Sequence, residues 1–173
     1  MSASFYPAKH PFTVQFSNRL ALLAILQFIS IPAFAEQFRV VAVSDGDTIT
    51  VEPIEGGDRA KVRLHGIDAP ELRQPYGEAA KAFTLNITLF KEIAVRPAPQ
   101  GADRYGRIVA VVEVPGAGIL QELLLEAGLA WVYPAYCKDC GKWENVQEQA
   151  REQRKGLWTD ENPVEPWEWR KRR

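Results

Sequence analysis

Two carboxylates flank a proline in the segment HGIDAPELRQ, residues 65–74. Asp68 and Glu71 stand three positions apart, directly after the β-branched and basic run KVRL. Acids at this spacing often lie on a turn or cap a helix without any catalytic role. They can also share the work of a metal site, where one carboxylate binds the cation and the other handles a water molecule. The elements around them decide between these interpretations.

A second pair of acids, Asp45 and Asp47, flanks a glycine in the sequence VSDGDTITV. Residues 38–54 are predicted as two strand segments with a bend at this pair, and residues 60–67 as the next strand after a glycine-containing hairpin turn. Because an antiparallel hairpin returns the chain to its starting end, Asp47 and Asp68 are expected to converge. Converging carboxylates repel each other unless a cation joins them, and oxygen ligands favour a hard divalent cation such as calcium.

Two arginines stand at the ends of predicted strands. Arg63 alternates with Val62 and Leu64, so its side chain points away from the face that carries them. Arg107 follows the turn DRYG, just before an apolar run at residues 107–114 that is typical of a buried strand. Each could simply pair with an acid, Arg107 with Asp103 for example. A guanidinium also matches phosphate oxygens, so the acids and arginines together supply the groups needed for phosphodiester hydrolysis.

The remaining pattern predicts the elements that must position these groups. Residues 91–97 form a fourth strand and residues 107–114 a fifth, while helical spacing is predicted within 75–90, 118–130 and 145–155. Gly128 stands where the second helix would be capped. Five short strands with helices inserted and appended favour a compact β-barrel with about three packed helices, a mainly β fold with α (α+β).

The composition fits one soluble globular domain: 173 residues, 46% hydrophobic and 25% charged. Residues 1–35 join a basic start, an apolar run and the small-residue ending Ala33-Phe34-Ala35, which predicts a secretory signal peptide. The alternative is an uncleaved anchor, but polar residues and a proline interrupt the apolar run. We therefore expect a periplasmic or secreted protein that is free of the membrane after cleavage.

Without the leader the chain holds 19 basic and 22 acidic residues. A slightly acidic domain cannot attract nucleic acid through a general positive field, so any phosphate recognition must be local. The two cysteines, Cys137 and Cys140, form the motif CKDC. Zinc would need four soft ligands, and the only histidines are His10 and His65. A local disulfide is favoured over free or redox-active thiols in an oxidising compartment.

Five segments resemble the staphylococcal nuclease (thermonuclease) family: VSDGDTITV, VRLHGIDAPE, DRYGRIVAVV, LLEAGLAWVY and AREQRKGLW. They occur in the family's order and extend over roughly residues 38–158. The resemblance implies an OB-fold-like five-stranded barrel with three helices. It also implies a calcium-dependent endonuclease that acts on DNA and RNA, with single strands preferred, and leaves 3′-phosphate ends. We expect a monomer with a nuclease domain at residues 36–158 and a Trp/Arg-rich tail at residues 159–173.

The resemblance assigns roles residue by residue. It places the calcium ligands at the carboxylates of Asp47 and Asp68 and the backbone carbonyl of Ala69. It makes Glu71 the residue that orients or deprotonates the attacking water, and Arg63 and Arg107 the catalytic arginines that bind phosphate. It assigns Asp45 to an acid that does not bind the metal directly but acts on the water molecules around it. It assigns the substrate contacts to Tyr105, Tyr133 and Tyr136.

Two departures from the best-known family member bear on substrate affinity. The segment after Glu71 is short where that member has a lysine-rich loop, and the chain is acidic where that member is strongly basic. A non-catalytic OB-type module that binds nucleic acid or protein is therefore a competing hypothesis. A phosphoesterase acting on nucleotides is a third. The full set of acids and arginines favours the nuclease, since a binding module does not need them.

Overall fold

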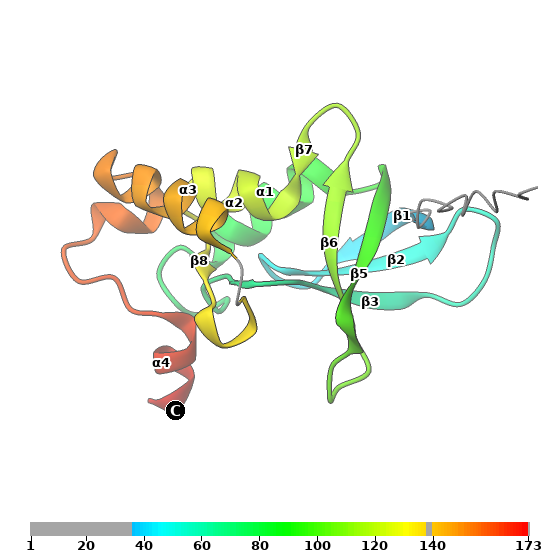
Figure 1. Cartoon of the computed structure of the whole chain (residues 1–173), viewed down its shortest axis with the longest axis horizontal. Coiled ribbons are helices and arrows are strands. Elements are labelled where there is room, and N and C mark those ends of the chain that lie inside the picture. The colour runs from blue at the N-terminus through cyan, green and yellow to red at the C-terminus, as the bar shows by residue number, and fades with distance from the viewer. Residues whose placement is uncertain (1–35, 138–139, 173) are drawn as a thin grey trace, which may run out of the picture. The chain divides into compact units, whose positions relative to one another are not determined.

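Five strands curl into a closed barrel in the computed structural model, which describes residues 36–137 and 140–172 (Figure 1). The strands are β1 Glu36–Val43, β2 Thr48–Pro53, β3 Ala60–Leu64, β5 Glu92–Ala102 and β6 Ile108–Val114. They run antiparallel in the order β3-β2-β1-β5-β6, and a parallel pairing of β3 with β6 closes the ring. The predicted α+β fold with an OB-like barrel is confirmed. The predicted signal peptide, residues 1–35, lies outside the described residues.

Three very short strands extend this framework. Strand β7 Gly118–Ile119 continues the sheet beside β6, and β4 Ile67–Asp68 pairs with β8 Trp131–Val132 in a separate two-stranded ladder. The single strand predicted over residues 60–67 is therefore divided, because a turn at residues 65–66 separates β3 from β4. Gly66 has a φ of 73°, a left-handed conformation that glycine adopts without strain. The turn directs Asp68 out of the barrel sheet.

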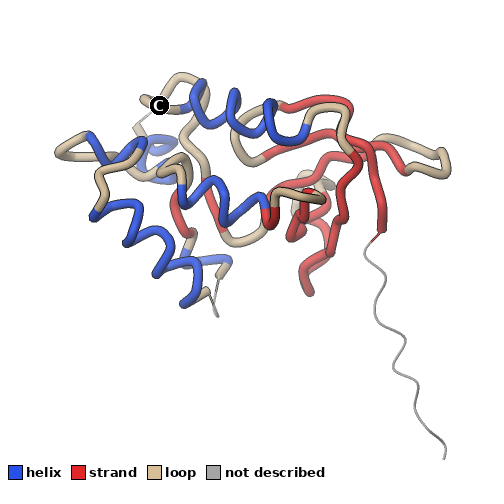
Figure 2. The backbone as a smooth tube through the Cα atoms, turned by 90° about the horizontal axis from the view of Figure 1, so that it is seen from above, coloured by secondary structure: helices blue, strands red, loops and turns tan. Residues whose placement is uncertain are grey.

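The helices gather beside one end of the barrel, as Figure 2 shows from above. They are α1 Gly77–Thr88, α2 Leu120–Glu126, α3 Gly141–Glu152 and α4 Pro166–Lys171, with 3₁₀ turns at Pro134–Tyr136 and Gly156–Thr159. The first three correspond to the predicted helices, although α3 begins four residues earlier than expected. Helix α4, in the tail, was not predicted.

Alternating residues of the strands fill the barrel interior. The fully buried side chains include Val40, Ile49, Val51, Val62, Leu64, Ile93, Val95 and Val112. Helix α2 adds Leu120, Leu124 and Leu125 to the same core. Burying one such side chain contributes about 1.5–3 kcal/mol, so this core gives the strands a fixed register. The polar groups at the strand ends are held on that rigid support.

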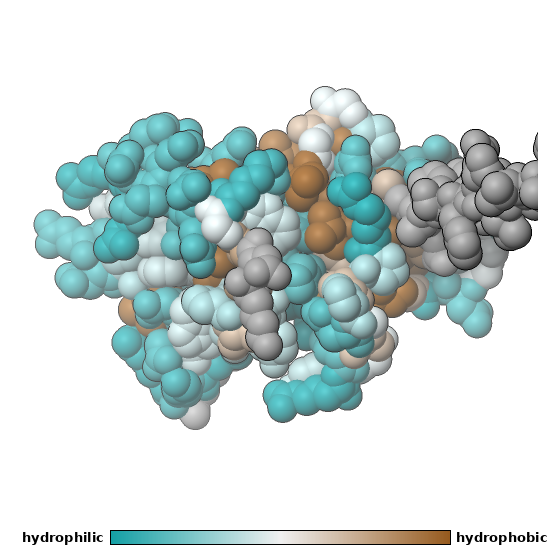
Figure 3. All heavy atoms as spheres, in the orientation of Figure 1, coloured by the Kyte–Doolittle hydropathy of each residue, from teal (hydrophilic) through white to brown (hydrophobic). Residues whose placement is uncertain are grey.

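The face seen in Figure 3 is mostly hydrophilic, and apolar side chains show mainly where the helices meet strands β6 and β7. Among the described residues, none of the helices has the length and apolar character needed to cross a membrane.

Candidate active site

The bend between β1 and β2 is anchored on both sides. The Asp45 carboxylate accepts a hydrogen bond from the Asp47 amide at 3.1 Å, and Thr84 Oγ1 of α1 donates to the Gly46 carbonyl at 2.6 Å. A Cβ atom on Gly46 would lie 2.7 Å from the methyl group of Ala69, so only glycine fits between these two segments. The predicted bend therefore has a fixed place at the end of the barrel.

Asp47 points into the protein rather than into solvent. Its Oδ2 accepts a hydrogen bond from the Ala69 amide at 2.6 Å and pairs with Arg63 Nη1 at 2.9 Å, while Oδ1 accepts from Thr48 Oγ1 at 3.2 Å. Burial raises the pKa of this carboxyl to about 7, although the charge of Arg63 opposes the rise. A cation beside Asp47 would favour its ionised form.

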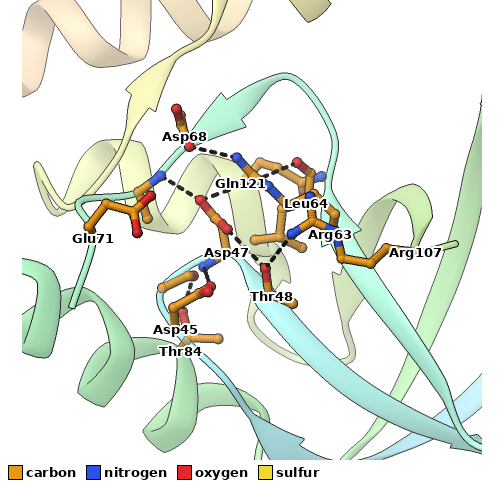
Figure 4. A network of polar contacts seen from close by, with 12 residues as sticks. Asp45, Asp47, Thr48, Arg63, Leu64, Asp68, Glu71, Thr84, Arg107 and Gln121 are labelled. Carbon is orange, nitrogen blue, oxygen red and sulfur yellow. Dashed lines mark hydrogen bonds and ion pairs between the residues drawn. The ribbon is translucent and has the colours of Figure 1, made fainter. Parts of the chain in front are cut away.

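Arg63 joins the two buried aspartates, as Figure 4 shows. Its Nη2 donates to Asp68 Oδ1 at 2.7 Å while Nη1 pairs with Asp47. Strand pairing accounts for this arrangement, because β2 and β3 run antiparallel with Thr48 opposite Arg63. The predicted convergence of Asp47 and Asp68 is observed, and Arg63 points away from the buried side chains of its own strand, as expected.

Glu71 lies beyond the strands, in the segment 69–76 between β4 and α1. Gln74 holds its backbone: Gln74 Oε1 accepts from the Glu71 amide at 3.1 Å, and the Gln74 amide donates to the Glu71 carbonyl at 2.7 Å. The Glu71 carboxylate accepts from Arg170 Nη1 at 2.8 Å. A side chain from the C-terminal helix thus reaches a predicted catalytic residue.

Arg107 lies just before β6 and pairs with Asp103, the alternative partner considered from the sequence. Its Nε and Nη2 atoms both lie 2.7 Å from Asp103 Oδ2, and Nη1 lies 3.4 Å from Thr48 Oγ1. Tyr105 stacks against the guanidinium, with its ring centre 5.4 Å away. The bonds from Arg107 and the Tyr105 amide hold the pKa of Asp103 below its usual range, although burial works in the opposite direction.

One cleft of about 990 Å³ contains every residue that the sequence analysis proposed for metal or substrate. Its lining includes Asp45, Asp47, Arg63, Asp68, Ala69, Glu71, Tyr105, Arg107, Tyr133 and Tyr136. Tyr105 and Tyr136 are largely exposed at its rim. These ten positions come from five separate parts of the chain, so the fold alone brings them together.

Sequence reasoning missed two residues of this region, both on α4. Arg170 lines the cleft and binds Asp68 as well as Glu71. Trp167 stacks on Tyr133, with ring centres 4.8 Å apart and planes at 5°. The only signal was composition, because the run PWEWRKRR concentrates tryptophan and arginine in a tail that otherwise lacks a pattern.

The donor atoms fit a hard cation. In the described ranges no three side chains of His, Cys, Asp or Glu converge as a ready-made metal cluster. Two carboxylates, Asp47 and Asp68, do converge beside the backbone of Ala69, and all the donors offered are oxygens. Calcium accepts such a mixed set of carboxylates, backbone carbonyls and water molecules.

The cysteines lie outside this cleft. Cys137 and Cys140 are paired as a disulfide, with Cα atoms 5.4 Å apart, within the usual range for such a bridge. Cys137 packs against the turn that holds Gly66, just before β4.

Comparison with known proteins decides the family. The family described as "Staphylococcal nuclease homologue" matches residues 61–160, more than half of the chain. The chain belongs to the staphylococcal nuclease family. The predicted enzyme class, a phosphodiester hydrolase of the nuclease type, is confirmed at this level.

Individual relatives of the nuclease family cover most of the chain. A micrococcal nuclease of Shigella flexneri is 37% identical over 165 residues, which is 88% of this chain and 91% of the relative. An uncharacterized endonuclease of Escherichia coli is 39% identical over 135 residues, 78% of this chain and 85% of the relative. The staphylococcal-like nuclease CAN1 of Arabidopsis thaliana is 44% identical over 113 residues, 64% of this chain and 33% of the relative.

Proposed function

We propose that the protein is a calcium-dependent endonuclease that hydrolyses phosphodiester bonds of DNA and RNA and leaves 3′-phosphate ends. One observation carries the proposal: Arg63 bridges two buried carboxylates, Asp47 and Asp68, in the same cleft that holds Glu71 and Arg107. Relatives named as nucleases and endonucleases support the reaction class.

Asp47, Asp68 and the carbonyl of Ala69 would hold the calcium ion. Asp45, one turn away, would bind its water molecules. When bound, the ion supplies positive charge to a phosphoryl oxygen and to the water around it. The protein side chains provide the rest of the chemistry.

Glu71 would orient the attacking water or accept its proton. Its carboxylate is partly exposed and faces the cleft, so a water molecule can reach it. Attack on phosphorus forms a bond to the water oxygen and breaks the bond to the 5′-oxygen. The 5′-oxygen leaves as a hydroxyl after taking a proton from solvent water, and the phosphate stays on the 3′-oxygen. Arg63 and Arg107 would stabilise the charge that grows on the phosphoryl oxygens, since a planar guanidinium matches two of them at once.

Single strands are the proposed substrate form. The exposed ring of Tyr136 at the rim of the cleft, next to Tyr133, offers a face on which an unpaired base can stack. Tyr105, beside Arg107, would lie near the phosphate. We further propose that the enzyme acts as a monomer, since this chain itself supplies every residue predicted for the metal, the chemistry and the substrate. Removal of residues 1–35 on export would place the enzyme in the periplasm or outside the cell.

Cleavage of a labelled single-stranded oligonucleotide tests the proposal. We expect products with calcium chloride and none after addition of a calcium chelator. Glu71→Gln should lower turnover by about 10²–10⁴-fold, the usual contribution of a general base. Glu78→Gln is the matched control, because Glu78 is an exposed acid at the start of α1, and it should cleave like the wild type.

Three outcomes would count against the proposal. Cleavage that persists with the chelator would remove the metal from the mechanism. Tight retention of the oligonucleotide without products would favour the binding-module hypothesis. Hydrolysis of mononucleotides but not of oligonucleotides would favour a different phosphoesterase.

A further inference from the structure

The C-terminal tail packs against the segment that carries Glu71. Gln74, whose side chain and backbone both bind the Glu71 backbone, also donates from Nε2 to the Val164 carbonyl at 2.6 Å. Pro166 at the start of α4 is buried, and Trp169 lines a small pocket together with Pro70 and Gln74. The tail thus contacts this segment on both sides of Glu71, at Pro70 and at Gln74, independently of Arg170.

Arg170 then reaches into the cleft with both of its terminal nitrogens. Nη1 donates to Glu71 Oε1 at 2.8 Å and to Asp68 Oδ1 at 3.3 Å, and Nη2 donates to Asp68 Oδ2 at 2.7 Å. Of the described residues, only Arg170 donates a hydrogen bond to the Glu71 carboxylate. No helix or strand fixes Glu71, so this fork is what sets the direction of its side chain.

We propose that Arg170 is a positioning residue of the nuclease: its guanidinium holds the Glu71 carboxylate next to Asp68 and so orients it toward the attacking water. The role given to Glu71 rests on the proposed function. The neighbouring Trp167, on the same helix, stacks on Tyr133 and holds that ring at the cleft as well. Helix α4 therefore completes the site from the end of the chain.

The contacts with the two arginines do not use every lone pair of Asp68. A carboxylate has about four lone-pair sites, and the three N–H contacts from Arg63 and Arg170 occupy three of those on Asp68. By this count, one lone-pair site on Oδ2 has no hydrogen-bond partner among the described residues. An inhibitory contact that excluded calcium would need to occupy all four lone-pair sites.

The charges agree with this count. Four acids gather at this end of the cleft, Asp45, Asp47, Asp68 and Glu71, and two guanidiniums, Arg63 and Arg170, lie among them. Arg107 is already paired with Asp103. Fully ionised, these six residues keep an excess of two negative charges, which one divalent cation balances. Arg73 and Arg104 also line the cleft but form no ion pair with these acids among the described residues. Arg170 thus lowers the repulsion between the acids without replacing the metal.

The first test needs no activity. Carboxyl ¹³C NMR of calcium-free protein compares the Glu71 side chain in the wild type, Arg170→Ala and Arg172→Ala. Arg172 is exposed in the same tail and removes the same charge, so it serves as the matched control. We expect Arg170→Ala to shift the resonance of the Glu71 carboxyl carbon and to leave that of the exposed Glu78 unchanged. Arg172→Ala should match the wild type throughout.

The second test measures kinetics and calcium binding in the same proteins. Arg170→Ala should lower kcat by about 10–100-fold, the usual cost of losing a residue that orients an active-site ligand. The KM should change by less than about threefold, because the substrate contacts remain. Arg170→Lys should recover part of kcat, since an ammonium keeps the charge but cannot bridge both carboxylates. If the alanine variant does not fold, the kcat of Arg170→Lys relative to the wild type still tests the proposal.

Four results would overturn the inference. Faster turnover of Arg170→Ala, or tighter binding of calcium measured by calorimetry with calcium chloride, would show that the tail inhibits the enzyme. A higher KM with unchanged kcat would make Arg170 a phosphate contact. An unchanged resonance of the Glu71 carboxyl carbon would show that Arg170 does not hold it, as would unchanged kinetics. If the wild type itself fails to cleave with calcium, the proposed function fails, while the NMR experiment still decides whether Arg170 fixes the Glu71 side chain.

Discussion

The two halves of the cleft are held in different ways. The barrel half, Asp47, Arg63 and Asp68, leaves only 7%, 14% and 2% of its side chains exposed. The rim half, Glu71, Arg107 and Arg170, leaves 32%, 26% and 42% exposed. Strand pairing fixes the first group, whereas loops and the tail fix the second. The barrel half therefore contributes to stability as well as chemistry, and the rim half mainly to chemistry.

The largest expected effect separates the two arginines that bind Asp68. Arg63→Ala leaves two buried carboxylates without their shared partner, so it should lower the free energy of unfolding by about 3–5 kcal/mol. Arg170→Ala removes a partly exposed contact and should cost less than about 1 kcal/mol. Urea unfolding at neutral pH measures both. Equal losses for the two variants would erase the distinction between the halves.

The second prediction concerns Arg107, where we expect a large loss of turnover and little loss of stability, in contrast to Arg63. Arg107→Ala should reduce turnover by about 10²–10³-fold, as expected for the loss of a transition-state donor, with little change in unfolding. Arg96→Ala is the control, because Arg96 forms an exposed pair with Glu113 on the barrel wall. An unchanged rate for Arg107→Ala would remove this residue from the mechanism and leave its pairing with Asp103 as its only function.

Strand alternation and the hairpin explain why the barrel half could be predicted from the sequence. Val62 and Leu64 fix the direction of Arg63, and the return of the hairpin brings Asp47 to Asp68. Helix α4 could not be predicted in this way. It has only six residues and no apolar period, and Arg170 meets its partner Asp68 across 102 positions of sequence. Contacts of that kind depend on the finished fold.

The third prediction examines the junction of the barrel half with its surroundings. A Cβ on Gly46 would lie 2.7 Å from the Cβ atoms of both Ala69 and Ala80. Gly46→Ala should therefore force the bend away from the Ala69 backbone and cost about 1–3 kcal/mol of stability, as overpacking usually does. Gly141→Ala, where the added methyl meets open space, is the control and should not destabilise the protein. A neutral Gly46→Ala would mean that the bend can move without disturbing Asp47.

The smallest effect is expected at the rim, where Asp103 binds Arg107. The folded protein holds the pKa of Asp103 below the 3.8 of an unperturbed aspartate. The pair therefore contributes stability above about pH 4, and this contribution is lost as the pH falls through the lower, folded-state pKa. Asp103→Asn should lower the free energy of unfolding by about 1 kcal/mol or less at pH 7, with the difference from the wild type vanishing in acid. Urea unfolding between pH 2.5 and 7 measures this difference. The range extends about 1.5 pH units below the pKa of an unperturbed aspartate and about 3 pH units above it. A loss as large as that of Arg63→Ala, or one that persists in acid, would show that the rim supports the fold as strongly as the barrel does.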